Sequence, residues 1–109
     1  MNRKLYYCTT DRLHETTAET LAERLQLALE VVEPRDLPRL EQEQADVILD
    51  WDYVPDEDRT RLLNSMKVNV IGVHGHQLGA SFLPRRGIVC SRHLDASFFE
   101  TLAETASAA

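Results

Sequence analysis

The sequence predicts an α/β fold in which a five-stranded parallel sheet lies between two layers of helices. Short apolar runs alternate along the chain with segments of helical periodicity, the order expected when each strand is followed by a crossover helix. The run Val47-Ile48-Leu49 is continuously apolar and branched, which is typical of a strand buried on both faces. Right-handed crossovers leave few topologies, and the doubly wound order 2-1-3-4-5 is the common solution for a chain of 109 residues.

The first half of the chain supplies three strands and two helices. We expect the first strand over residues 4–8, and then a helix opened by the capping box Thr16-Thr17-Ala18-Glu19. Val31-Val32 form a short second strand, and a brief polar helix follows over residues 37–44. The third strand covers residues 46–50, directly before the only tryptophan.

The second half continues the alternation. Pro55 and the acids that follow it predict the next helix. Strands are expected at residues 68–73 and 87–90, with a weak helical turn over residues 78–83 between them. Asp95 is a suitable N-cap for the last helix. The helix after Pro55 has three apolar residues for its buried side: Leu62, Leu63 and Met66.

The composition is that of one globular domain, which we expect to span residues 1–109. A hydrophobic fraction of 43% with 28% charged residues suits a single core. The formal net charge of −6 argues against a nucleic-acid partner, because phosphate binding depends on clustered Lys and Arg. The chain has neither a signal-peptide pattern nor an apolar run long enough to span a membrane, so we expect a cytoplasmic location.

The two cysteines fall in the first and fifth predicted strands. In the order 2-1-3-4-5, two strands separate Cys8 from Cys90, and a spacing of about 4.8 Å per strand puts them about 14 Å apart. A disulfide between them is therefore excluded by distance. We expect both to be small buried apolar residues.

Polar side chains gather where the predicted strands end. Parallel strands end at one edge of a sheet, and open α/β folds bind their ligands there. This edge is the candidate site, with an acidic group and a further group of edge-binding residues. The acids are Asp50, Asp52 and Asp11, and the others are Thr9, Thr10, His74, Ser91 and Arg92.

His74 and His76 form a candidate metal pair at the same edge. Residues two apart in an extended segment point to the same side, so both rings can reach one ion, with Asp52 or Asp11 as a third ligand. In the alternative interpretation, Gly75 turns the chain and the two rings diverge into solvent.

Two features predict contact with a protein partner or a second copy of the chain. Trp51 either packs under the helix that starts at Pro55 or, if exposed, anchors a partner. The apolar stretch over residues 78–83 is the other candidate contact surface.

The residues around Asp50 resemble the response-regulator receiver family. The resemblance covers most of the chain through its order of strands and helices, and it is sharpest at Val47-Ile48-Leu49-Asp50 followed by Pro55. It implies a receiver-like, flavodoxin-like fold and a role in signal transduction. It also implies that Asp50 accepts a phosphoryl group in the presence of Mg²⁺.

Three departures from the receiver pattern affect the phosphorylation chemistry. Thr9-Thr10 precede Asp11 where the family has a pair of acids, His74-Gly75 stand in place of a Ser or Thr, and Ser91-Arg92-His93 in place of a Lys. Phosphoryl transfer needs clustered carboxylates for Mg²⁺ and a cation for the developing charge. We therefore interpret the chain as a pseudo-receiver, a non-catalytic regulatory or protein-interaction domain without a cofactor. An atypical phospho-acceptor that uses Asp50 and Mg²⁺ is the alternative.

A second, partial resemblance concerns the first helix. Tyr7-Cys8-Thr9-Thr10 followed by Thr16-Thr17-Ala18-Glu19 resembles the opening of a flavodoxin, in which a Thr/Ser-rich loop binds the flavin phosphate. Here the loop between them contains two acids and no glycine, and the acids would repel a phosphate. A small metal- or flavin-binding protein that uses the carboxyl edge of the sheet is thus a third interpretation.

Overall fold

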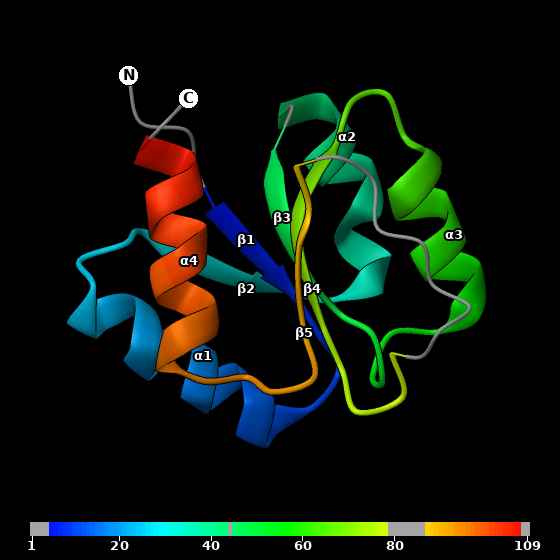
Figure 1. Ribbon diagram of the computed structural model, residues 1–109. Helices are drawn as coiled ribbons and strands as arrows, with labels where there is room; N and C mark the ends of the chain where they lie inside the picture. Colours follow the sequence, from blue (N-terminus) through cyan, green and yellow to red (C-terminus); the bar gives the residue numbers. More distant parts are fainter. Residues whose placement is uncertain (1–4, 44, 79–86, 108–109) are drawn as a thin grey trace.

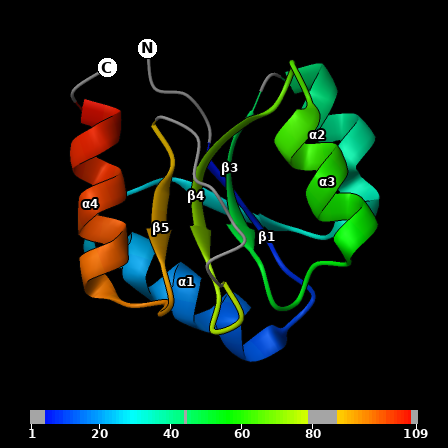
Figure 2. The same ribbon diagram turned by 45° about the vertical axis from the view of Figure 1, so that its right-hand side comes forward.

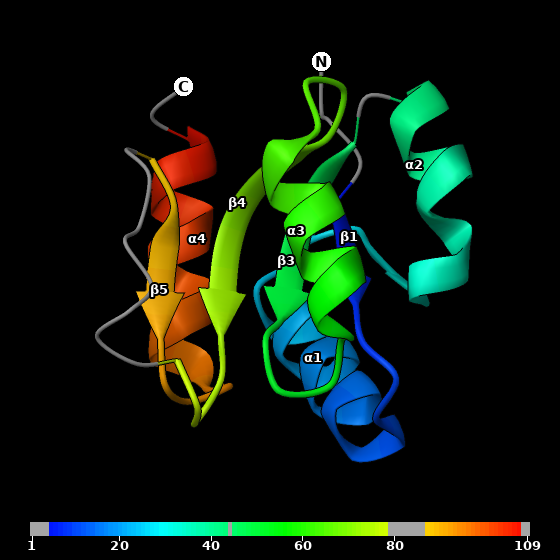
Figure 3. The same ribbon diagram turned by 90° about the vertical axis from the view of Figure 1, so that its right-hand side faces the viewer.

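A five-stranded parallel sheet in the order β2-β1-β3-β4-β5 forms the centre of the protein, which confirms the predicted flavodoxin-like fold. The computed structural model describes residues 5–43, 45–78 and 87–107. Figure 1 shows the arrangement, and Figure 3 shows that β3, β4 and β5 end at the same edge. The strands are β1 (Leu5–Cys8), β2 (Leu29–Val32), β3 (Asp46–Asp50), β4 (Asn69–His74) and β5 (Val89–Ser91).

The helices cover the sheet in pairs, α1 with α4 on one face and α2 with α3 on the other (Figures 1 and 2). A short 3₁₀ turn, Pro34–Asp36, leads into α2. None of the helices in the described ranges is long and apolar enough to cross a membrane. The helices are α1 (Arg12–Arg24), α2 (Leu37–Glu43), α3 (Asp56–Asn64) and α4 (Ala96–Ser107).

Side chains of the central strands alternate between two apolar clusters. Tyr6 and Val47 pack on the α2/α3 side, whereas Tyr7 and Ile48 pack on the α1/α4 side. Because side chains two apart on a strand share a face, Asp50 follows Ile48 toward α1 and α4. The last residue of β3 therefore places a carboxyl group beneath α1.

The predicted start of α1 at the Thr16 capping box is wrong. The helix begins at Arg12, with Asp11 as N-cap, and the Asp11 Oδ2 accepts a 3.0 Å hydrogen bond from the His14 N–H. The hydroxyl of Thr16 donates instead to the backbone carbonyl of Arg12. An Asp cap satisfies a free N–H of the first turn as well as Thr does, so the helix starts at the earlier cap. This earlier start places His14 in the first turn of α1.

Two burial predictions are also wrong. Met66 is 101% exposed, because α3 ends at Asn64 and Met66 lies beyond it. Cys90 is exposed because β5 is the edge strand, whereas Cys8 is buried, and both are free thiols within the described residues. The predicted contact surface over residues 78–83 lies outside the described residues, apart from half-buried Leu78.

Trp51 packs against the apolar cluster beneath α2 and α3. The Arg59 guanidinium of α3 lies over its ring at 4.3 Å, and the Arg59 Nη1 donates to the Trp51 carbonyl at 2.8 Å. The tryptophan therefore packs under the helix that follows Pro55, the first of the two predicted placements.

Candidate metal centre

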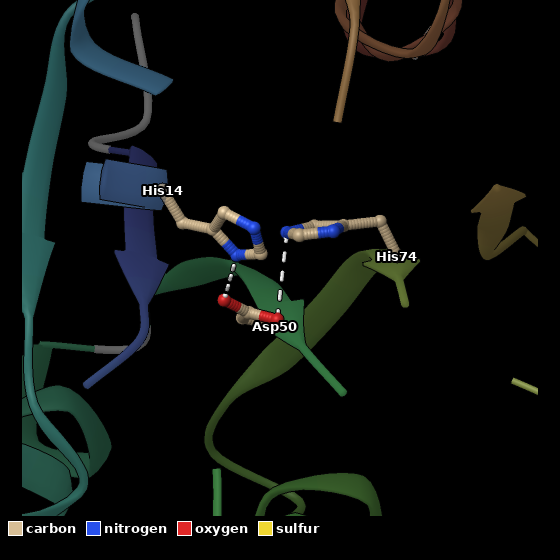
Figure 4. A group of neighbouring side chains, drawn as sticks. All are labelled: His14, Asp50 and His74. Carbon is tan, nitrogen blue, oxygen red and sulfur yellow. Dashed lines mark hydrogen bonds and ion pairs between the residues drawn. The ribbon is translucent and has the colours of Figure 1, made fainter. Parts of the chain in front are cut away.

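Side chains from three elements meet at the carboxyl end of the sheet. Figure 4 shows His14 of α1 and His74 of β4 both directed at Asp50 of β3. One ligand atom from each residue lies within 4.8 Å of the others. Asp50 and His74 are fully buried, while the His14 side chain is 27% exposed. The cluster sits beside β1 and β3, the point where the strand order reverses and such folds bind ligands.

The Asp50 carboxylate is bonded on one oxygen only. Its Oδ2 accepts from the Thr9 hydroxyl at 2.7 Å and lies 2.7 Å from the His14 Nδ1. Because a carboxylate only accepts, the His14 Nδ1 carries the proton of this bond. A third donor, the Tyr7 hydroxyl, lies 3.3 Å from the same oxygen. The buried Oδ1 has no hydrogen-bond partner among the described residues.

His74 is held as a neutral base next to this carboxylate. Its Nε2 lies 2.6 Å from the Tyr7 hydroxyl and 3.9 Å from the Asp50 Oδ1. Burial lowers the pKa of His74 to about 4, although the charge of Asp50 works in the opposite direction. Burial also raises the pKa of Tyr7 far above its usual range, and the charge of Asp50 adds to that effect. At neutral pH, the Tyr7 phenol is therefore protonated and can donate to the lone pair on His74.

A one-residue irregularity in β4 directs His74 into the cluster. Val47 of β3 pairs with Val70, but the next residue, Ile48, pairs with Gly72, so Ile71 is an extra residue in β4. A bulge of this kind moves all later side chains to the opposite face. Without it, His74 would share the α2/α3 face with Val70. With it, the His74 ring lies against Phe98 of α4, with ring centroids 5.7 Å apart.

The structure brings together three of the predicted edge residues, namely Thr9, Asp50 and His74. Asp52 serves a different purpose, since its carboxylate accepts the backbone N–H groups of His76 and Gln77 at 2.7 and 3.0 Å. Asp52 therefore fixes the turn after β4.

His76 is exposed, and its ring packs edge-on against His93 at 5.4 Å between centroids. Within the described part of the chain, the predicted ligand set of His74, His76 and Asp52 is not a group of converging ligand atoms.

The other predicted edge residues have local structural contacts. Asp11 caps α1, and the Thr10 hydroxyl donates to the Tyr53 carbonyl at 2.5 Å. The Ser91 hydroxyl donates to the backbone carbonyl of His93, and Arg92 is exposed. Among the described residues, Asp11 lies outside the group of converging ligand atoms, and its Oδ2 is 4.0 Å from the His14 Nδ1.

His14 and Tyr7 are the site residues that the sequence analysis did not single out. The sequence predicts a loop at His14, whereas the Asp11 cap puts this residue on the first turn of a helix, directly over Asp50. The signal that would have found it is the Asp-x-x-His spacing, because the third residue after a cap lies in the first turn. The sequence pattern around Tyr7 indicates only an apolar residue in the first strand.

The ligand types fit zinc and related transition-metal ions. Two imidazoles and one carboxylate form a common ligand set of catalytic zinc sites, and imidazole also suits Cu, Fe and Ni. The same residues do not fit the Mg²⁺ implied by the receiver resemblance. Mg²⁺ prefers several oxygen ligands, but imidazole nitrogens supply two of the three converging groups in the described residues.

Comparisons with family models, curated proteins and solved structures gave no match to this chain. The strand order is therefore what the chain shares with flavodoxin-like proteins, and fold alone does not determine function. The residues of the cluster are therefore the basis for assigning a function.

Proposed function

We propose that this protein binds a divalent transition-metal ion of the zinc class between His14, Asp50 and His74. The observation that carries the proposal is the Asp50 Oδ1, a buried carboxylate oxygen that lacks a hydrogen-bond partner among the described residues. Leaving such a group unsatisfied costs about 1–3 kcal/mol or more. A cation bound at Oδ1 would remove that cost.

The protonation states support metal binding. Metal ligands must be unprotonated, and burial already keeps His74 neutral by lowering its pKa to about 4. The ion would bind the carboxylate at the unpartnered Oδ1 and would replace the proton on the His14 Nδ1, which in its absence bonds the Asp50 Oδ2. His14 would then carry its proton on Nε2. The Thr9 hydroxyl would keep its bond to Asp50 and orient the carboxylate, as outer-shell partners of metal ligands do.

Partial exposure of His14 supports access for an ion. Its side chain is the exposed member of the three, at 27%. The Tyr53 ring packs edge-on against the His14 ring, with centroids 5.0 Å apart, and both belong to loop or first-turn segments at the sheet edge. We therefore expect an ion to reach the cluster from the α1 side, past the partly exposed His14.

Calorimetric titration of chelator-treated protein with Zn²⁺ tests this proposal. We expect one ion per chain, and at least about tenfold weaker binding for His14→Gln. His76→Gln is the matched control, since it removes a histidine that lies outside the cluster. Equal binding by the wild type and His14→Gln would place the ion elsewhere, and an absence of heat with the wild type would refute metal binding.

A receiver-like regulatory domain without turnover is the second candidate function. The observation that favours it is the position of Asp50, which ends the third strand and is fully buried, with Oδ2 engaged by Thr9 and His14. In this interpretation the carboxylate is a structural remnant and Asp50 is not phosphorylated. Acetyl phosphate with Mg²⁺ should then add no mass to the protein. A phosphate adduct that is lost in Asp50→Asn would support the phospho-acceptor alternative.

A protein partner or a homodimer remains a prediction for either function, as does a cytoplasmic location. Light scattering of the metal-free and zinc-loaded protein addresses the homodimer. A mass of twice 12.4 kDa in either state would support self-association.

A further inference from the structure

The Tyr7 hydroxyl is a further polar group that contacts both buried members of the cluster. It lies 2.6 Å from the His74 Nε2 and 3.3 Å from the Asp50 Oδ2. The Tyr7 ring is stacked on the His74 ring with centroids 5.5 Å apart and an interplanar angle of 22°. Tyr7 is fully buried in the central strand β1, so its oxygen is held in place by the sheet.

We propose that Tyr7 is the fourth ligand of the metal centre and closes it. This inference rests on the proposed binding of an ion by His14, Asp50 and His74. Zinc bonds to nitrogen and oxygen are about 2.0–2.2 Å long, so neighbouring donors of a tetrahedral site lie about 3.3 Å apart. The Tyr7 hydroxyl lies 2.6 Å from the His74 Nε2 and 3.3 Å from the Asp50 Oδ2, and the His14 Nδ1 lies 2.7 Å from that same Oδ2, each within 1 Å of this spacing. The His74 Nε2 lies 3.9 Å from the other carboxylate oxygen, Oδ1.

Charge balance favours the same assignment. A divalent ion with the single carboxylate of Asp50 would leave one net positive charge in a buried site, which is costly without a partner. When the Tyr7 oxygen binds the ion as a phenolate, its proton leaves to solvent and the net charge becomes zero. A bound metal ion favours the deprotonated form of its ligand, as it does for thiols and water.

Asp11 faces His14 from the rim of the cluster, with its Oδ2 4.0 Å from the His14 Nδ1. It is partly exposed and caps α1 through the same oxygen, so its charge is screened by solvent. The phenolate is therefore the better-placed second anion.

A fourth protein ligand has a functional consequence. Catalytic zinc sites have three protein ligands and leave one position for water or substrate, whereas sites with four protein ligands are structural. With Tyr7 bound, this centre would retain its ion without presenting it to a substrate. A retained ion is consistent with a protein that responds to metal occupancy and does not turn over a substrate.

Ultraviolet difference spectroscopy during Zn²⁺ titration tests the assignment. We expect a tyrosinate band that grows to one phenolate per bound ion in the wild type and is absent in Tyr7→Phe. The chain has three tyrosines, and Tyr53→Phe is the matched control because its ring touches the His14 ring from outside the ligand set. Tyr53→Phe should keep the band. Co²⁺ in place of Zn²⁺ should give the intense visible spectrum of a tetrahedral ion in the wild type and a weaker one in Tyr7→Phe.

The outcomes separate this inference from the proposed function. Zinc binding without a tyrosinate band, and with equal or tighter affinity in Tyr7→Phe, would show that Tyr7 competes for His74 and does not bind the ion. That result would overturn the fourth ligand and leave the three-residue site intact. If the wild type binds neither ion, the proposed function fails as well.

Discussion

Replacing Asp50 by Asn removes the charge at the centre of the cluster while keeping the size of the side chain. The remaining amide oxygen can still accept from Thr9 and His14, which bond the Asp50 Oδ2 at 2.7 Å each. The amide nitrogen takes the place of one carboxylate oxygen, and it is a donor where a metal ligand must be an acceptor. The substitution should therefore abolish tight metal binding while the apolar core stays folded.

Two opposing effects set the stability of metal-free Asp50→Asn. Loss of the charge weakens the hydrogen bonds to Oδ2 by about 1 kcal/mol each. The amide nitrogen at the place of Oδ1 is also unpartnered, but a neutral amide is less costly to bury than a charged carboxylate, which returns about 1–3 kcal/mol. We expect the free energy of unfolding of the metal-free variant to lie within about 1 kcal/mol of the wild-type value.

Zinc should separate the two proteins more clearly, because it should stabilise the wild type much more than Asp50→Asn. At a free zinc concentration of 100 times the wild-type Kd, the wild type gains about 2.7 kcal/mol, or about 10 °C in Tm. A variant with about 100-fold weaker binding gains about 0.4 kcal/mol at the same concentration.

Thermal unfolding monitored by circular dichroism, with chelator or with buffered Zn²⁺, measures both effects. Asp52→Asn is the matched control, because Asp52 is an acid near the same strand end that holds a turn outside the cluster. It should keep the full zinc-dependent rise in Tm. An equal zinc-dependent rise in the Tm of Asp50→Asn and of the wild type would contradict metal binding at Asp50. A loss of more than about 3 kcal/mol in the free energy of unfolding of metal-free Asp50→Asn would contradict the balance of hydrogen-bond and burial effects.

Three further predictions follow from burial and packing. Because burial lowers the pKa of His74 from 6.5 to about 4, the unfolded chain takes up a proton first as the pH falls. Metal-free protein should thus lose about 2 kcal/mol between pH 7.5 and pH 5 in denaturant titrations, and His74→Gln should lose less over that window. A thiol reagent should label Cys90 in the native protein and reach Cys8 only on unfolding, since Cys8 is buried and burial raises the pKa of its thiol to about 12; equal rates would contradict the fold. Gly72→Ala should cost about 1–3 kcal/mol, because a Cβ there would lie 2.7 Å from the Leu102 Cδ2; an unchanged denaturation midpoint would count against this packing of α4.

The strand order was predictable because each strand can be recognised from a short apolar run in the sequence. Val47-Ile48-Leu49 is apolar and branched, and its strand falls at Asp46–Asp50 as expected. The alternation with helices then leaves one common topology. The same topology correctly separates Cys8 on β1 from Cys90 on β5 by two strands. The burial of Cys90 was mispredicted, because the pattern of apolar residues does not say how fully an edge strand is covered.

The candidate site was predictable only in part. The sequence located the edge, and with it Asp50 and His74, because strand ends are set by the same apolar pattern. The sequence does not predict that the His74 side chain points into the cluster on the α1/α4 face, because this orientation depends on the extra residue Ile71 in β4. Nor did it select His14, whose position depends on which of two adequate caps, Asp11 or Thr16, begins the helix. The apolar pattern of the sequence specifies neither the extra residue in β4 nor the cap that begins α1.

The four histidines of the chain allow the most direct test of the metal centre. His14 and His74 lie in the cluster, whereas His76 and His93 pack against each other outside it. In imidazole ¹⁵N NMR spectra of chelator-treated protein, addition of one equivalent of Zn²⁺ should shift a ring nitrogen of His14 and one of His74. The resonances of His76 and His93 should stay in place. Shifts confined to His76 and His93, or no shifts at all, would contradict metal binding at Asp50.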